Sequence, residues 1–206
     1  MQTVKGVKEG QMEFLVPDVY DASMFDGIPL KESYTYEDYA KLPEGAPYQL
    51  IGGELVMIPS PTPYHQEISQ RLEFKILSYV EKKNLGRLYH APLDVFLSDK
   101  DVYQPDIIFI SRDRLEIIGK KKIEGAPDIV IEILSSSTAY YDLRIKYRAY
   151  EGYGVREYWI VDPELKKIEV YENQNKKFKI YSEAEGEGTV SSKVLGELVI
   201  SLNEIF

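Results

Sequence analysis

The 206-residue chain contains no cysteine, and it also lacks any long apolar run. The absence of cysteine excludes disulfide bonds, zinc–thiolate sites and thiol nucleophiles. No stretch approaches the ~18 consecutive apolar residues that a transmembrane helix needs. The opening residues, MQTVKGVKEG, lack the apolar core of a secretory signal. The sequence therefore predicts a cytoplasmic protein that does not enter a membrane.

Positive charge is also scarce, because 25 Lys and Arg residues stand against 34 Asp and Glu residues. The formal net charge is −9. Proteins that bind nucleic acids usually carry a basic face, since neutralising phosphates supplies most of their affinity. An acidic chain can still carry a local basic patch, and a metal-dependent nuclease needs clustered carboxylates. The overall charge thus weighs against tight, non-specific DNA binding by a monomer.

Tyrosine is abundant, with 17 residues, whereas tryptophan occurs once. Tyrosines are common at oligomer interfaces and on surfaces that stack nucleic-acid bases, and they also fill half-buried cores. We expect most of the tyrosines to lie in the core or at an interface rather than to stack bases.

Two helices and several strands are predicted from the spacing of apolar residues. Residues 64–83 carry a stripe at four-residue intervals, typical of a helix with one buried face. The stripe consists of Ile68, Leu72, Ile76 and Val80. We expect Gly86 to end this helix, and we expect a second helix, capped by Ser137 or Thr138, to end near Glu151. Strands are predicted at residues 48–59, as a hairpin turning at Gly52-Gly53, and at 87–97, 104–111, 128–134 and 156–162. Residues 167–172 and 177–182 are predicted to pair as a second hairpin.

The order of these elements is helix, strand, strand, strand, helix, strand. Residues 128–134 and 156–162 are joined through a helix, which makes these two strands parallel, while the shorter preceding connections favour antiparallel pairing. We therefore predict one α/β (α+β) domain, residues 34–206, with a mixed sheet, a helix against each face, and extra hairpins. Residues 1–33 show no clear period and predict an extended N-terminal arm that packs on the body or on a second subunit.

Two predicted strands carry isolated acids, and a buried charge requires a partner or a metal ion. Asp106 follows a proline near the start of one strand, and Glu132 lies between two isoleucines in another. Asp128 shares a face with Glu132, but at ~3.3 Å per residue they are ~13 Å apart, too far to bind one ion. Asp106 and Glu132 are therefore the pair that we expect to bind Mg²⁺ or Mn²⁺.

Lys146 on the second predicted helix is the candidate that would stabilise a phosphodiester transition state or deprotonate the attacking water. Asp142 lies four residues earlier, on the same helix face. Structural roles are open alternatives. Asp106 would accept backbone N–H groups at a strand start, and Glu132 would form a buried salt bridge. Asp142 and Lys146 would then form a surface pair, worth only ~0.3–0.5 kcal/mol.

Two upstream residues are secondary candidates for the same site. His65 is one of only two histidines and lies at the start of the first predicted helix. A capping or surface role accounts for His65 as well as a role in the site does. Glu54, on the preceding hairpin, would contribute its carboxylate through a bound water.

The acid-bearing segments together resemble the Uma2 family of restriction endonuclease-like proteins, which belongs to the PD-(D/E)XK nuclease superfamily. The resemblance is carried by QPD at 104–106 and by GAPDIVIEILSSSTAYYDLRIKYRAYEGYGVREYWIVDP at 125–163. It extends upstream to YQLIGGELVMIPSPTPYHQEI and downstream to LGELVISLNEIF, and so covers about residue 34 to the end. It implies a restriction endonuclease-like core and hydrolysis of DNA phosphodiester bonds by an enzyme that often acts as a homodimer.

By this resemblance, Asp106 and Glu132 are the two metal-binding acids. Lys146 is the catalytic lysine, which some families of the superfamily carry on the following helix. The usual lysine position, two residues after the second acid, is occupied here by Leu134. Three further family positions match as well, at Glu54, His65 and Asp142. The chain departs from the family at Gly52, usually an aspartate, and at SSST (135–138), usually Ser-Pro-Ser-Thr.

These observations give three hypotheses for the function. The leading hypothesis is a Mg²⁺- or Mn²⁺-dependent endonuclease that cleaves DNA, with Asp106 and Glu132 as metal ligands and Lys146 as the assisting lysine. Leu134 and the acidic net charge favour a second hypothesis, a non-catalytic module that retains the nuclease fold for binding or assembly. The third is a metal-dependent hydrolase of a small phosphate ester, for which a narrow pocket without a basic rim would be the sign.

Overall fold

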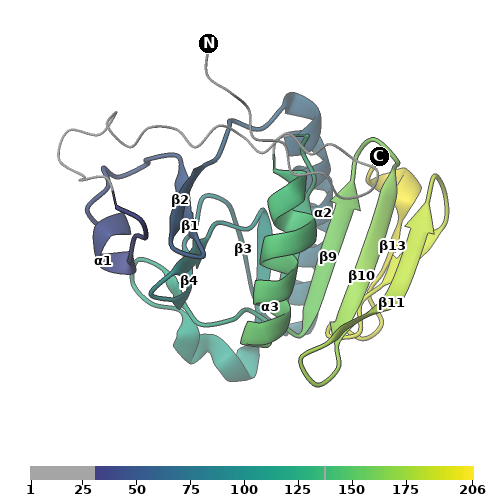
Figure 1. Cartoon of the computed structure of the whole chain (residues 1–206). Helices are drawn as coiled ribbons and strands as arrows, with labels where there is room; N and C mark the ends of the chain where they lie inside the picture. The colour runs from purple at the N-terminus through teal and green to yellow at the C-terminus, as the bar shows by residue number, and fades with distance from the viewer. Residues whose placement is uncertain (1–30, 137) are drawn as a thin grey trace, which may run out of the picture.

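The structure of the protein is a computed structural model that describes residues 31–136 and 138–206 (Figure 1). Most of the predicted N-terminal arm, residues 1–30, lies outside the described residues, as does Ser137, one of the two predicted helix caps. Within the described residues no helix is long and apolar enough to cross a membrane.

A six-stranded sheet forms the centre of the molecule, in the order β11-β10-β9-β8-β6-β3. Its strands are β3 (Gly86–His90), β6 (Ile107–Ser111), β8 (Ile129–Ile133), β9 (Glu157–Asp162), β10 (Lys167–Asn173) and β11 (Phe178–Glu185). Strands β8 and β9 are parallel, and the other neighbours are antiparallel. Every residue of β8 is buried. The predicted mixed sheet is confirmed, and the strand predicted at 128–134 lies in its interior.

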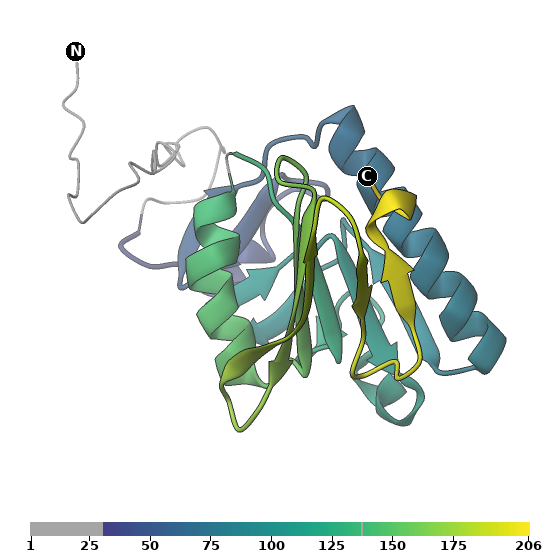
Figure 2. The same ribbon diagram turned by 90° about the vertical axis from the view of Figure 1, so that its right-hand side faces the viewer.

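One helix covers each face of this sheet (Figure 2). Helix α2 (Pro63–Lys83) packs through its predicted stripe onto the odd-numbered residues of β6 and β8, such as Ile107 and Ile131. The opposite face of the sheet, which carries Ile108 and Val130, is covered by helix α3 (Tyr147–Tyr153). Each fully buried isoleucine or leucine contributes ~1.5–3 kcal/mol, so the alternation along β6 and β8 specifies which helix meets which face.

Helix α2 ends differently from the prediction. Asn84 takes the left-handed conformation (φ 55°) that terminates the helix, whereas Gly86 already belongs to β3. A Cβ atom at Gly86 would lie 2.0 Å from the carbonyl oxygen of Ile110 on β6. Glycine is therefore required at this position for close strand pairing rather than for a helix cap.

A second sheet lies beside the first, and the sequence did not predict it. It has the order β2-β1-β5-β4-β7 and consists of β1 (Tyr48–Ile51), β2 (Glu54–Met57), β4 (Val95–Ser98), β5 (Asp101–Tyr103) and β7 (Ile123–Glu124). Helix α1 (Tyr36–Tyr39) packs against it. The predicted strand 87–97 is wrong, because the chain turns at Pro92 and contributes β3 to one sheet and β4 to the other. Proline lacks the N–H group that a continuous strand would need there.

The C-terminal segment packs against helix α2, as Figure 2 shows in yellow beside blue. It forms the two-stranded sheet β12 (Thr189–Ser191) and β13 (Val199–Ser201), followed by a 3₁₀-helix at Leu202–Glu204. The buried carboxylate of Glu157 on β9 accepts hydrogen bonds from Trp159, Ser192, Lys193 and Val194, at 2.6–3.0 Å. These bonds join the segment to the central sheet.

Tyrosines contribute heavily to the interior, as expected from the sequence. Six of the tyrosines that the structure describes are buried: Tyr34, Tyr39, Tyr48, Tyr103, Tyr150 and Tyr158. Tyr103 and Tyr158 each contact the ring of Tyr150, at centroid distances of 5.5 and 5.1 Å. Their hydroxyl groups need partners in this interior, and two of them reach the site described next.

Candidate active site

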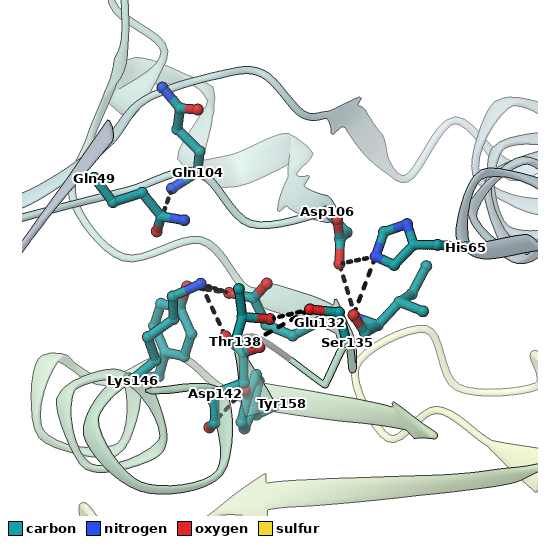
Figure 3. Close-up of polar contacts among 12 residues, drawn as sticks. Gln49, His65, Gln104, Asp106, Glu132, Ser135, Thr138, Asp142, Lys146 and Tyr158 are labelled. Atoms are coloured by element: carbon teal, nitrogen blue, oxygen red, sulfur yellow. Dashed lines mark hydrogen bonds and ion pairs between the residues drawn. The ribbon is translucent and has the colours of Figure 1, made fainter. Parts of the chain in front are cut away.

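A cleft of about 1190 Å³ opens where strand β8 ends and strand β6 begins. Five of the six sequence-predicted site residues line it: His65, Asp106, Glu132, Asp142 and Lys146 (Figure 3). The sixth, Glu54, is not among the lining residues. It is exposed at the start of β2. Burial raises the pKa of Tyr141, and the charge of Glu54 adds to that rise.

Strand register brings the two candidate metal ligands together. In the antiparallel pairing of β6 with β8, Ile107 lies opposite Ile131, and Ile108 lies opposite Val130. One further step along the same register places Asp106 opposite Glu132, on the face covered by α3. Asp106 lies immediately before β6, not inside a strand beginning at residue 104. The juxtaposition inferred from the sequence is therefore present.

Asp106 connects three segments of the chain. Its Oδ2 atom accepts a hydrogen bond from the backbone N–H of Ile133 at 2.7 Å and lies 3.4 Å from Nε2 of His65. The same Nε2 atom lies 3.1 Å from the carbonyl oxygen of Ile133. The side chain of Asp106 retains 20% exposure, so it is held in place and still faces the cleft. Accepting a backbone N–H, the structural alternative for Asp106, is therefore compatible with a place in the site.

His65 reaches this position because α2 begins at the edge of the cleft. The backbone N–H of His65 donates to the Thr62 side chain at 3.2 Å, which caps the helix. Burial lowers the pKa of His65, but the hydrogen bond and charge of Asp106 outweigh it and raise the pKa above its ordinary value. Its Nδ1 atom is buried and has no hydrogen-bond partner among the described residues. His65 thus orients Asp106 through Nε2 alone.

Glu132 is buried within a compact ion-pair network. Its Oε1 atom accepts hydrogen bonds from Nζ of Lys146 at 3.0 Å and from the hydroxyl of Tyr150 at 2.8 Å. Nζ of Lys146 also lies 2.9 Å from Oδ1 of Asp142. Glu132, Asp142 and Lys146 are at most 3% exposed, so the alternative of a solvent-exposed Asp142–Lys146 pair is wrong.

The network carries more negative than positive charge. Burial raises the pKa of Glu132 to about 8; Lys146 opposes this rise, whereas Asp142 and Asp106 add to it. Burial likewise raises the pKa of Asp142. Burial disfavours the charge of Lys146 as well, but the two carboxylates outweigh it and raise its pKa above the ordinary value. The lysine therefore stays protonated, and the acids beside it hold a proton more readily than isolated carboxyl groups do.

The helix that carries Asp142 and Lys146 has an unusual geometry. Tyr141–Lys146 forms a π-helix, which continues into α3 at Tyr147. π-Helical turns are rare and frequently occur at functional sites. Tyr158 on β9 donates a hydrogen bond to the carbonyl oxygen of Asp142 at 3.1 Å, which helps to hold this wider turn against the sheet.

Sequence reasoning missed two groups of polar residues near the site. One is Tyr150, although its position four residues after Lys146 on the helix was a usable signal. The other is a hydrogen-bonded group that also lines the cleft, in which Asp94 Oδ1 accepts from Tyr39 and Gln104, both at 2.8 Å. The backbone N–H of Gln104 in turn donates to Gln49 at 3.0 Å. Gln104 lies two residues before Asp106, and this spacing could have indicated it.

Asp128 lies at the far end of β8 from the cleft, as the distance argument predicts. Its buried carboxylate accepts hydrogen bonds from the N–H and hydroxyl of Ser111, at 2.8 and 2.9 Å. It also pairs with Arg114 at 3.0 Å and with Arg156 at 3.1 Å. Burial works to raise its pKa, yet these donors outweigh it and lower the pKa. Asp128 is therefore a fully satisfied structural carboxylate.

Comparison with known proteins shows what the chain is similar to. Residues 36–203 match the Uma2 family, described as "Putative restriction endonuclease". A similar solved structure, at 1.96 Å resolution, is that of a "putative nuclease belonging to DUF820" from Anabaena variabilis ATCC 29413. It is 25% identical, with a TM-score of 0.70, and the match covers 84% of this chain and 97% of that one. No curated protein matches the chain. The likeness agrees with the predicted restriction endonuclease-like core.

Proposed function

The chain belongs to the Uma2 family, and from this premise we propose that it is a Mg²⁺- or Mn²⁺-dependent endonuclease that hydrolyses DNA phosphodiester bonds. The family and the similar solved structure are both described as nucleases. One observation of this chain supports the proposal most directly: the register sets Asp106 opposite Glu132, and Lys146 Nζ lies 3.0 Å from the Glu132 carboxylate.

The residues at this edge of the sheet fit a divalent cation. Asp106 Oδ2 and the carbonyl oxygen of Ile133 both lie within 3.4 Å of one atom, His65 Nε2, so two hard oxygen donors converge there. Glu132 lies opposite Asp106, and the surplus of buried carboxylate charge favours a cation. Among the described residues no three acidic or histidine side chains group closely enough to hold a metal ion by themselves. The Ile133 carbonyl and water molecules would therefore complete the set held by Asp106 and Glu132.

A bound dication would orient the attacking water and neutralise charge developing on the phosphate. The chain's own residues have separable tasks. His65 holds Asp106 in place from the helix side. Lys146 is protonated, so we assign it to stabilising negative charge on the phosphate rather than to accepting a proton from water.

The proposal is tested by replacing Asp106 with alanine or asparagine. We expect both variants to lose Mg²⁺- or Mn²⁺-dependent cleavage of plasmid and linear DNA, while thermal unfolding monitored by circular dichroism stays cooperative. Asp113→Asn is a matched control, because Asp113 is an exposed acid that does not line the cleft. It lies next to Arg114, which pairs with Asp128. Metal-dependent cleavage by a purified, folded Asp106→Ala protein would refute the assignment.

A non-catalytic module is the second candidate, and one observation favours it. The Glu132 oxygen that faces α3 is already bound by Lys146 and Tyr150, as in a structural ion pair. Isothermal titration with Mn²⁺ separates the two candidates: a nuclease binds the ion with a stoichiometry that Asp106→Ala abolishes, and a structural module binds none at millimolar metal.

The phosphate-ester hydrolase is less well supported, because Lys121 and Lys122 line the same cleft and supply the basic edge that this hypothesis excludes. Two further expectations accompany the nuclease proposal: a homodimer, which light scattering would measure, and a cytoplasmic location, which fractionation would measure.

A further inference from the structure

Three consecutive lysines, at residues 120–122, lie at or beside the cleft. Lys121 and Lys122 line the cleft, and Lys120 and Lys121 are exposed. Across residues 31–136 and 138–206, none of these three forms an ion pair, whereas six other lysines lie within 3.2 Å of a carboxylate. Those six are Lys31, Lys75, Lys83, Lys146, Lys167 and Lys177. In a chain of net charge −9, this run of available ammonium groups is a local site for a polyanion.

Lys122 is held in a defined position. Its Nζ atom lies 3.7 Å from the centroid of the Tyr36 ring and 4.2 Å from that of Phe96. The two rings meet edge to face at 4.9 Å. Cation–π contacts of this kind orient a lysine without neutralising its charge. Lys122 is therefore pre-positioned and still attractive to an anion.

Backbone and side-chain contacts connect this lysine to the candidate catalytic acid. The N–H of Ile123 donates to the carbonyl of Asp94 at 2.8 Å, and the Asp94 carboxylate accepts from Gln104 at 2.8 Å. Gln104 stands two residues before Asp106. The basic segment and Asp106 are thus joined by contacts between segments that all line the cleft.

An aromatic side chain is available in the same cleft. Tyr64 on the first turn of α2 is 40% exposed and immediately precedes His65. Proteins that bind single-stranded nucleic acids combine a positively charged groove with aromatic rings on which bases stack. Both parts are present around this cleft.

The burial of the site favours a single strand over a duplex as its ligand. Glu132, Asp142 and Lys146 are each at most 3% exposed, so a phosphate must enter the cleft to reach them. In a duplex each phosphate is fixed beside its neighbours by the rigid double helix. A single strand can bend one phosphate inward while its neighbours contact the rim.

We propose that the cleft binds single-stranded nucleic acid, whose backbone phosphates contact the segment Lys120–Lys122 while a base stacks on Tyr64. This inference rests on the proposed nuclease function, because it identifies the substrate class of that site. It concerns binding, however, and so it can be measured apart from cleavage.

The first test measures binding without metal. Fluorescence anisotropy in EDTA compares a labelled single-stranded oligonucleotide with the duplex of the same sequence, from 50 to 200 mM salt. We expect the single strand to bind at least tenfold more tightly. In the variant Lys121→Gln/Lys122→Gln, the slope of log K against log salt should fall by about 1.4, because each single-strand phosphate contact contributes about 0.7. The control Lys82→Gln/Lys179→Gln removes equal charge from exposed, unpaired lysines outside the cleft and should leave the slope unchanged.

The second test concerns stacking. Tyr64→Ala should weaken single-strand binding about tenfold without changing the salt slope, since stacking contributes ~1–3 kcal/mol per base by alanine substitution. Phe74→Ala, which removes a 69%-exposed aromatic ring from α2 outside the cleft, is the matched control.

Each outcome decides between the two proposals. Equal or tighter duplex binding, or an unchanged slope in the Lys121/Lys122 variant, overturns the single-strand inference even if the protein cleaves DNA. Salt-dependent single-strand binding in a protein that cleaves nothing with Mg²⁺ or Mn²⁺ supports the inference and refutes the nuclease chemistry instead.

Discussion

The two ends of strand β8 hold two acids in opposite electrostatic states. Asp128 and Glu132 stand four residues apart, share a face, and are 0% and 3% exposed. Asp128 meets two arginines and both donors of Ser111, and its pKa lies below the ordinary value. Glu132 shares a single lysine with Asp142, and burial raises its pKa to about 8.

This difference shows that burial alone does not mark a functional acid. Both carboxylates pay the same kind of desolvation penalty, and the number of cations per carboxylate sets the outcome. At Asp128 two guanidinium groups serve one carboxylate, so nothing remains to be neutralised. At Glu132 one ammonium group serves two carboxyl groups, with Asp106 nearby, so the acids hold protons more readily and a cation would displace them at the edge of a cleft. The first arrangement suits stability and the second suits a cationic ligand.

Removing each charge isosterically tests the contrast between Asp128 and Glu132. Glu132→Gln should reduce metal-dependent cleavage about a thousandfold, which equals about 4 kcal/mol of transition-state stabilisation, because a proposed metal ligand is lost. Asp128→Asn should leave cleavage per folded molecule unchanged and lower the free energy of unfolding by about 3 kcal/mol, because two arginines lose their partner. Cleavage assays and urea titrations on the same preparations measure both effects. The reverse pattern would contradict the proposed division between the two ends.

A second prediction concerns the single cation at the Glu132 end. Lys146→Met should lower the free energy of unfolding by about 3 kcal/mol, because Glu132 and Asp142 would be buried without a positive charge. Adding Asp142→Asn to this variant should restore part of the loss, since it removes one of the unpaired carboxylates. A double-mutant cycle by chemical denaturation measures this coupling. Additive losses would show that the two residues do not interact.

The pH dependence of stability should have opposite signs at the two ends. Between the ordinary Glu132 pKa of 4.5 and its folded value of about 8, the native state holds a proton that the unfolded state has released. Rising pH therefore lowers the stability of the wild type relative to Glu132→Gln, by up to about 1.4 kcal/mol per pH unit. Asp128 has a lowered pKa, so below its ordinary value of 3.8 rising pH raises the stability of the wild type relative to Asp128→Asn.

Urea titrations from pH 3 to pH 9 in EDTA test this contrast, since the chelator removes any contribution from bound metal. Asp113→Asn again serves as the control, because its carboxylate is exposed at the surface. Parallel pH profiles for the Glu132 and Asp128 variants would show that the two acids do not titrate differently.

The smallest loss of stability is expected for Arg156, the more exposed of the two arginines that pair with Asp128. The Arg156 side chain is 54% exposed, whereas that of Arg114 is 31% exposed. Arg156→Met should therefore lower the free energy of unfolding by about 1 kcal/mol or less. Arg114→Met should cost more, because Arg114 also donates to the carbonyl of Ala126 at 2.9 Å. Equal losses of stability in thermal melts would mean that the exposure of each arginine does not determine how strongly it stabilises the fold.

Much of the fold was predictable because its signals are local. The four-residue stripe of α2 and the isoleucine-rich strand β8 each specify an element through periodicity, and both are confirmed. The second sheet was not predictable, because residues 87–97 read as one strand. Which of two sheets a short segment joins depends on partners far along the chain. The parallel pairing of β4 with β7 is an example, since Val95 lies beside Ile123.

Local spacing along the chain was enough to find the acids isolated among apolar residues, to pair Asp106 with Glu132, and to place Lys146 on the helix that follows. Those facts depend on alternation and spacing along the chain. The folded structure was needed to show that Asp142 and Lys146 are buried with Glu132 rather than exposed, and that Asp128 is neutralised by Arg114 and Arg156. The physical reason is that a carboxylate's charge state depends on the cations and solvent around it, and distant segments bring these together only when the chain folds.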